Sequence, residues 1–166
     1  MIFAISNDFS DEEFAAIGRL LWAFTVLENE LARGAMKLRK DVALRGNSGP
    51  IDDQIRKIVK QDIKGRFDGF IAALKASSSN GEESDWIAEA ETKFKDGLLW
   101  RNRICHGKWS RLGDGRMGVQ FFDRDSVRVE QFTEIEPVSI NDLGKLKDTT
   151  LLWVVEIARK AHLVQE

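Results

Sequence analysis

The sequence predicts a mainly α-helical protein: a four-helix bundle with a small antiparallel β insertion between the third and the last long helix. Two observations support this fold class. Apolar residues recur every three or four positions through most of the 166 residues, which is the period of an amphipathic helix. Over about residues 108–133 they alternate instead, as in strands with one buried face. We expect a single domain over residues 1–166, because a chain of this length can bury a substantial core.

The first helix is expected to begin after Ser10 and to end near Arg45. Ser10 and Glu13 have the spacing of a capping box, in which each side chain accepts a hydrogen bond from the other residue's backbone. The apolar stripe then continues for roughly 35 residues, or about 50 Å at the helical rise. A helix of this length favours a partner chain that covers part of it. Glu28 interrupts the stripe at a position where an apolar residue is expected.

The same periodicity predicts the next two helices and the turns around them. A turn over residues 46–50 precedes a second helix over about residues 51–74. A serine-rich loop over residues 77–81 precedes a third helix over about residues 82–105. Gly107 directly follows that helix, and glycine in this place is typical of a left-handed helix cap.

Two strands are expected after the third helix. Apolar residues alternate over residues 117–121 and again over residues 127–129. Glycine and aspartate at residues 113–115 indicate the turn before the first of these segments. The last long helix is expected to begin after Ser139, which forms an N-terminal cap together with Asp142.

Composition narrows the functional classes. The net charge is −2, so RNA binding would require a local basic patch instead of a global positive field. No apolar run has the length that a membrane-spanning helix needs. The single cysteine, Cys105, fits a reducing compartment, and we expect a cytoplasmic protein. Metal-ligand spacings, nucleotide-triphosphate loops and serine elbows are missing from the sequence, and we expect no cofactor.

The residues best suited to catalysis lie at the end of the third helix. Asn102 and His106 lie four positions apart, on one helical face. Arg101 continues the inward apolar stripe, so its charge should meet a carboxylate. Glu28, which interrupts the apolar stripe of the first helix, is the candidate carboxylate. Arg101 and His106 lie about 140° apart around an ideal helix, so they converge only if the helix ends at Gly107 and His106 turns away from it.

The segment Arg101-Asn102-x-x-x-His106 resembles the motif of HEPN domains, in which four to six residues separate an arginine from a histidine. Asparagine after the arginine is the commonest form of that motif, and the position at the end of the third helix also matches. HEPN domains are small helical bundles, and many are metal-independent endoribonucleases of toxin–antitoxin and other RNA-targeting systems. They typically form dimers in which two motifs build one cleft. The β insertion is an addition to the simplest bundle of this kind.

The resemblance implies RNA cleavage by the substrate's own 2′-hydroxyl, without a metal ion. His106 would act as general acid or base, since imidazole titrates near neutral pH. Arg101 would bind the phosphate and stabilise the developing charge. Asn102 would orient the histidine or the phosphate, and Glu28 would position Arg101. The implied partners are a second copy of the chain, RNA and, for a toxin, an antitoxin protein.

The expected substrate-binding residues are Arg103, which lies beside Asn102 and His106 within the motif, and Lys108 and Trp109, which follow the motif. Lys108, Arg111 and Arg116 could form a modest basic rim, although such residues also discourage sheet-to-sheet pairing at strand edges. Trp109 could line the cleft or serve as a core anchor.

Two alternative functions stay open. The chain could be a catalytically inactive HEPN-like module that binds nucleotide, RNA or a partner protein. It could also be an unrelated helical interaction domain, in which Arg103 and His106 only stabilise the C-terminal end of a helix.

Overall fold

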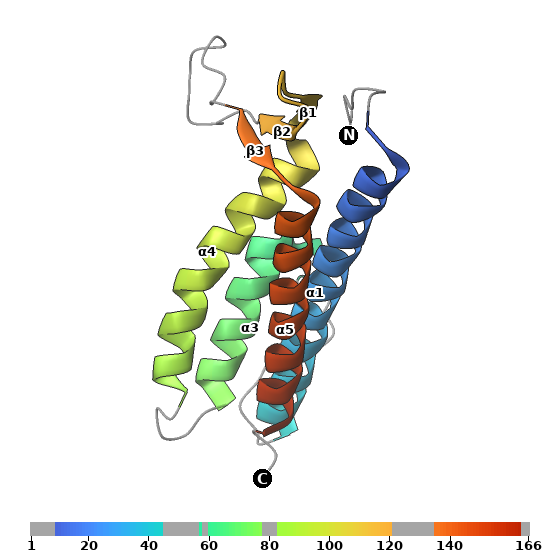
Figure 1. The fold of residues 1–166 in the computed structure, drawn as a ribbon. Coiled ribbons are helices and arrows are strands. Elements are labelled where there is room, and N and C mark those ends of the chain that lie inside the picture. Colours follow the sequence, from blue (N-terminus) through green and yellow to red (C-terminus); the bar gives the residue numbers. More distant parts are fainter. Residues whose placement is uncertain (1–8, 45–56, 58–59, 78–82, 121–134, 164–166) are drawn as a thin grey trace. The chain divides into compact units, whose positions relative to one another are not determined.

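The computed structural model describes residues 9–44, 57, 60–77, 83–120 and 135–163, and these residues form a mainly helical fold. They contain four helices, α1 (Asp11–Leu44), α3 (Ile63–Ser77), α4 (Ser84–His106) and α5 (Ile140–Leu163) (Figure 1). Between α4 and α5 the chain forms an antiparallel sheet of three strands, β1 (Lys108–Arg111), β2 (Met117–Gln120) and β3 (Glu136–Val138). The predicted fold class, helices with a small β insertion before the last one, is confirmed. None of the described helices is both long enough and apolar enough to cross a membrane.

The chain divides into two compact units, and each has its own hydrophobic core. Unit 1 comprises Met1–Phe24 and Leu99–Thr149, and unit 2 comprises Thr25–Leu98 and Thr150–Glu166. Helices α1, α4 and α5 are each continuous and contribute residues to both units.

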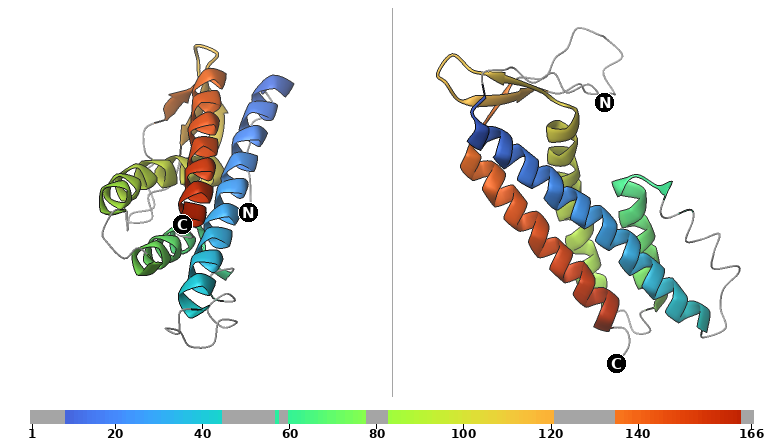
Figure 2. Two further views of the ribbon diagram at one scale, coloured as in Figure 1. Left: turned by 90° about the horizontal axis from the view of Figure 1, so that it is seen from below. Right: turned by 90° about the vertical axis from the view of Figure 1, so that its right-hand side faces the viewer.

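In the described part of unit 2, segments of α1, α3, α4 and α5 pack together around one core (Figure 2). Leu31 on α1 and Phe70 on α3 are fully buried in its core. The rings of Phe67 and Phe94 stack with their centroids 3.8 Å apart, which joins α3 to α4. Gly34 allows α1 to approach this layer closely, because a Cβ atom at this position would lie 2.9 Å from the Phe70 ring.

Unit 1 combines the sheet with the first part of α1, the last turns of α4 and the start of α5. The middle strand, β2, pairs with both neighbours, and Trp109 on β1 lies opposite Val119 on β2. Trp109 is 1% exposed, and its ring meets that of Phe9 edge to face. Among the described strands β3 lies at the edge of the sheet, where the missing backbone donor of Pro137 is tolerated.

Both predicted N-terminal caps are present. The Ser10 backbone N–H donates to the Glu13 carboxylate at 2.8 Å, and the Glu13 N–H donates to the Ser10 hydroxyl at 3.3 Å. At the start of α5, Ser139 and Asp142 exchange the corresponding bonds at 3.0 and 3.1 Å. These reciprocal bonds satisfy backbone donors that the helix itself leaves unpaired. They explain why α1, a helix of 34 residues, begins where the sequence predicted.

The prediction of one continuous second helix over about residues 51–74 is wrong. Gln61 and Asp62 are not helical, and α3 begins at Ile63. The Asp62 carboxylate accepts a hydrogen bond from the Gly65 N–H at 2.8 Å, which makes Asp62 the N-cap of a new helix. The turn predicted over residues 46–50 lies outside the described residues, and so does the loop predicted over residues 77–81 except for Ser77, which is the last residue of α3.

The sheet differs from the prediction in its third strand. β1 and β2 lie within the predicted insertion, and the turn between them contains Gly115 with a φ of 83°, in the left-handed region. The third strand, Glu136–Val138, begins after the predicted end of the insertion near residue 133. With three residues and a central proline, β3 is too short for alternation to reveal it. The strand predicted over residues 127–129 lies outside the described residues.

Candidate functional site

The Arg–His motif lies in unit 1, at the C-terminal end of α4. The helix ends on His106, close to the predicted end. Gly107 does not form the expected left-handed cap, because Gly115 alone has a positive φ among the described residues. Its N–H instead donates to the Arg103 carbonyl at 2.7 Å, which continues the helical bonding pattern.

A close approach of the helix end to the sheet explains the glycine at position 107. A Cβ atom there would lie 2.2 Å from the Arg103 carbonyl oxygen and 2.5 Å from a methyl group of Val119. Any larger side chain would therefore push the end of α4 away from β2. The chain can pass directly from His106 into strand β1 only because this position has no side chain.

The two polar residues that open the motif contact each other. Nη1 of Arg101 donates to Oδ1 of Asn102 at 3.3 Å, and both side chains are half-buried. The carboxamide oxygen of Asn102 thus contacts the arginine, and the role that the resemblance implies for Asn102, orienting the histidine or the phosphate, stays a prediction. His106 is exposed, so its imidazole is accessible to a substrate.

Arg103 is held by two contacts within unit 1. Nη1 of Arg103 forms an ion pair with the Glu136 carboxylate at the start of β3. The same guanidinium lies over the Trp100 ring, 5.1 Å from its centroid. The ion pair ties α4 to β3, and Arg103 would have to release Glu136 before it could bind a phosphate with its full charge.

Lys108 and Trp109 differ in their exposure. Lys108 is the exposed first residue of β1. Trp109 is buried, and its Nε1–H donates to the Ile104 carbonyl at 3.3 Å. The Trp109 indole therefore belongs to the core of unit 1, and its burial favours the interpretation as a core anchor.

Glu28 lies in unit 2, on helix α1, and is half-buried. Its backbone carbonyl accepts a hydrogen bond from Nη1 of Arg66 at 3.2 Å. Because Arg101 belongs to unit 1, the expected approach of the Glu28 carboxylate to the Arg101 guanidinium stays a prediction.

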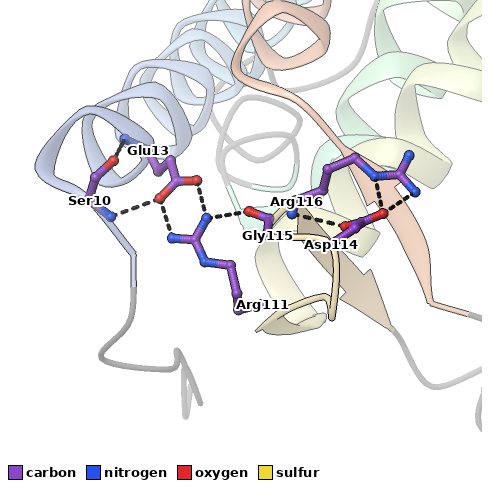
Figure 3. A network of polar contacts seen from close by, with 6 residues as sticks. All are labelled: Ser10, Glu13, Arg111, Asp114, Gly115 and Arg116. Atoms are coloured by element: carbon purple, nitrogen blue, oxygen red, sulfur yellow. Dashed lines mark hydrogen bonds and ion pairs between the residues drawn. The ribbon is translucent and has the colours of Figure 1, made fainter.

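Both arginines of the predicted basic rim, Arg111 and Arg116, are paired with carboxylates. Arg111 on β1 donates from Nη1 and Nη2 to the two oxygens of Glu13, each at 2.7 Å, and from Nη1 to the Gly115 carbonyl (Figure 3). The Arg111 hydrogen bond lowers the pKa of Glu13 from 4.5 to about 2, against an opposing effect of burial. Arg116 forms an ion pair with Asp114 at 2.6 Å. Among these three cations, Lys108 has the clearest access to a ligand.

A surface pocket of about 340 Å³ lies in the same unit and was not predicted from the sequence. Residues from α4, β3 and α5 line it: Trp100, Pro137, Val138, Asp142, Lys145, Leu146 and Thr149. Periodicity could not reveal this pocket, because it depends on how three separate elements pack together.

Comparisons with known proteins give no guide to the site: no protein-family model, no curated protein and no solved structure matches the chain. Within the described residues, no three His, Cys, Asp or Glu side chains gather closely enough to hold a metal ion. Any assignment of function therefore depends on the geometry of the residues described above.

Proposed function

We propose that this protein is a metal-independent endoribonuclease of the HEPN type. One observation carries the proposal: the Arg101-Asn102-x-x-x-His106 segment forms the end of a helix where the histidine is exposed and the arginine contacts the asparagine. In phosphodiester cleavage without a metal ion, a guanidinium can bind the phosphate while an imidazole transfers the proton.

The proposed reaction is attack of a ribose 2′-hydroxyl on the adjacent phosphorus. His106 removes the proton of the hydroxyl as the new P–O2′ bond forms and the P–O5′ bond breaks. Arg101 binds the non-bridging oxygens, where negative charge develops in the transition state. The departing 5′-oxygen takes up a proton, and the products are a 2′,3′-cyclic phosphate and a 5′-hydroxyl. In this scheme Asn102 is a positioning residue that acts through Arg101.

The second proton transfer favours a homodimer. One motif supplies a single histidine, whereas the reaction removes one proton and donates another. His106 of a second copy, related by a twofold axis, would be the matching acid. In the same proposal Glu28 positions Arg101, Lys108 contributes to phosphate binding, and an antitoxin protein could cover the cleft. A monomer that cleaves RNA would contradict the dimer but leave the chemistry in place.

The test of cleavage uses the full chain and a fluorescently labelled single-stranded RNA in excess EDTA. We expect cleavage by the natural protein and a loss of at least about 100-fold in His106→Ala, the usual scale for removing a general acid or base. His162→Ala is the matched control, because it removes the only other histidine, which lies in unit 2 beside Lys37. His162→Ala should keep full activity.

Two further variants of the substrate and the protein sharpen this test. A strand of the same base sequence with 2′-deoxyribose throughout should resist cleavage, because it lacks the attacking 2′-hydroxyl. The 5′ ends of the RNA products should accept phosphate from a kinase without prior treatment, because they carry a hydroxyl. Arg101→Lys keeps the charge but loses the planar pair of donors, so we expect a lower rate with an unchanged fold by circular dichroism. Uncut RNA with a correctly folded natural protein would overturn the proposal, as would equal activity of His106→Ala and the natural protein.

A further inference from the structure

The pocket in unit 1 has the size and the lining of a small-ligand site. Its volume of about 340 Å³ lies at the lower end of the range for such sites, which is about 300–1,000 Å³. Pro137, Val138 and Leu146 supply apolar surface from β3 and α5, and Trp100 supplies an aromatic ring from α4. A site of this composition suits a flat ring system that carries a few polar groups.

The Trp100 indole is held in place by its neighbours. The Arg103 guanidinium lies over the ring, and Glu136 pairs with the same guanidinium. Because Trp100 also lines the pocket, the ring is fixed on one side by Arg103 while it presents surface to a ligand. An aromatic side chain that is already ordered loses little conformational entropy when a second ring stacks on it.

One face of α5 supplies the polar groups. Asp142, Lys145 and Thr149 are spaced by three and four residues, so they lie along one side of the helix. The Ser139 hydroxyl lowers the pKa of Asp142 by hydrogen bonding, with a smaller contribution from the charge of Lys145, so this carboxylate stays ionised near neutral pH. The exposed Lys145 ammonium offers a positive charge to an anion one turn further along.

We infer that this pocket binds a nucleotide, with the base stacked on Trp100 and the phosphate on Lys145. Stacking of a base on an aromatic side chain contributes about 1–3 kcal/mol. The Asp142 carboxylate can accept a hydrogen bond from an exocyclic amino group, which adenine, guanine and cytosine carry and uracil lacks. The nucleotide can be free or can be one unit of an RNA strand. This inference concerns equilibrium binding and does not depend on the proposed cleavage.

Fluorine NMR of the full chain labelled with fluorotryptophan tests the inference. The chain has five tryptophans, and the Trp100 signal is identified by its loss in Trp100→Phe. We expect adenosine monophosphate to shift this signal in a saturable way, with uridine monophosphate binding more weakly. Lys145→Ala should weaken binding of adenosine monophosphate by about fivefold to tenfold, the scale of one partly exposed charge contact. It should leave the affinity for adenosine, which has no phosphate, unchanged.

The matched control is Lys147→Ala, which removes a cation on the same helix that pairs with Asp148 at 3.0 Å and does not line the pocket. A shift by a short RNA but not by the free nucleotide would assign the ligand to a strand. An unshifted Trp100 signal with either ligand at millimolar concentration would overturn the inference, as would equal effects of the two lysine variants. Binding that persists in His106→Ala without any RNA cleavage by the natural protein would reject the proposed function and leave the pocket assignment intact.

Discussion

The Glu13–Arg111 ion pair gives the sharpest prediction about stability, because it joins the first turn of α1 to strand β1 within unit 1. Glu13→Gln removes the charge while it keeps the shape of the side chain. The difference between a pKa of 4.5 and one of about 2 corresponds to about 3 kcal/mol, at about 1.4 kcal/mol per pH unit. The Glu13 and Arg111 side chains are 12% and 28% exposed, so water screens part of this energy. We expect a loss of about 1–2 kcal/mol in the free energy of unfolding at neutral pH.

The loss should depend on pH in a defined direction. The pKa of Glu13 is lower in the folded state, so its contribution is complete above 4.5 and disappears as the pH falls toward about 2. The natural protein and Glu13→Gln should therefore differ most near neutral pH and converge in acid.

Urea unfolding at a series of pH values, followed by circular dichroism and tryptophan fluorescence, measures this difference. Glu12→Gln is the control, because Glu12 is an exposed neighbour in the same helical turn. A difference between Glu13→Gln and the natural protein that stays constant down to about pH 2 would refute the assignment of the energy to the charged pair. A variant with unchanged stability at neutral pH would refute the pair's contribution altogether.

Three further variants test the end of α4, the interior of α4 and the start of α5. Gly107→Ala should destabilise the protein by about 1–3 kcal/mol because its Cβ atom would meet the Arg103 carbonyl and Val119. Gly97→Ala, whose Cβ atom would meet nothing within 4 Å, should stabilise α4 by about 0.5–1 kcal/mol. Thermal unfolding of the Gly107→Ala and Gly97→Ala variants should therefore show opposite shifts. Ser139→Ala should lower the free energy of unfolding by about 1 kcal/mol, because the helix loses its cap. The same variant should raise the pKa of Asp142, since the Ser139 hydroxyl is the main cause of its low value. NMR titration of the Asp142 carboxyl checks this second effect.

Local signals in the sequence predicted most of the fold. Capping residues define the starts of α1 and α5 through bonds between residues three positions apart, so the sequence contains the whole interaction. The prediction failed where two local signals compete. The apolar period continues across Gln61 and Asp62, but the Asp62 carboxylate bonds the Gly65 backbone and starts a new helix. An aspartate within an apolar period has no sequence signature that separates a cap from an exposed helical residue.

Contacts between distant residues could not be predicted in the same way. Arg111 and Glu13 are 98 positions apart, and nothing in the pattern around either residue indicates the other. The pocket beside Trp100 likewise depends on β3, whose three residues carry no periodic signal. The sequence therefore located the motif but could not show which neighbouring cations are already paired. Arg103, Arg111 and Arg116 are each bound to a carboxylate, which a count of basic residues near the motif overlooks.

The contact between Arg101 and Asn102 bears on the choice between catalysis and helix capping. Capping accounts for Arg103 and His106, because cationic side chains in the last turn interact favourably with the negative end of the helix dipole. It does not account for Arg101, which lies before the last turn and is half-buried against the Asn102 carboxamide. Partial burial of a guanidinium costs solvation energy, and the end of a helix can be stabilised without that cost. Arg101 therefore has a role besides capping, which we propose to be phosphate binding, and Arg101→Lys tests this role because lysine keeps the charge but loses the planar pair of donors.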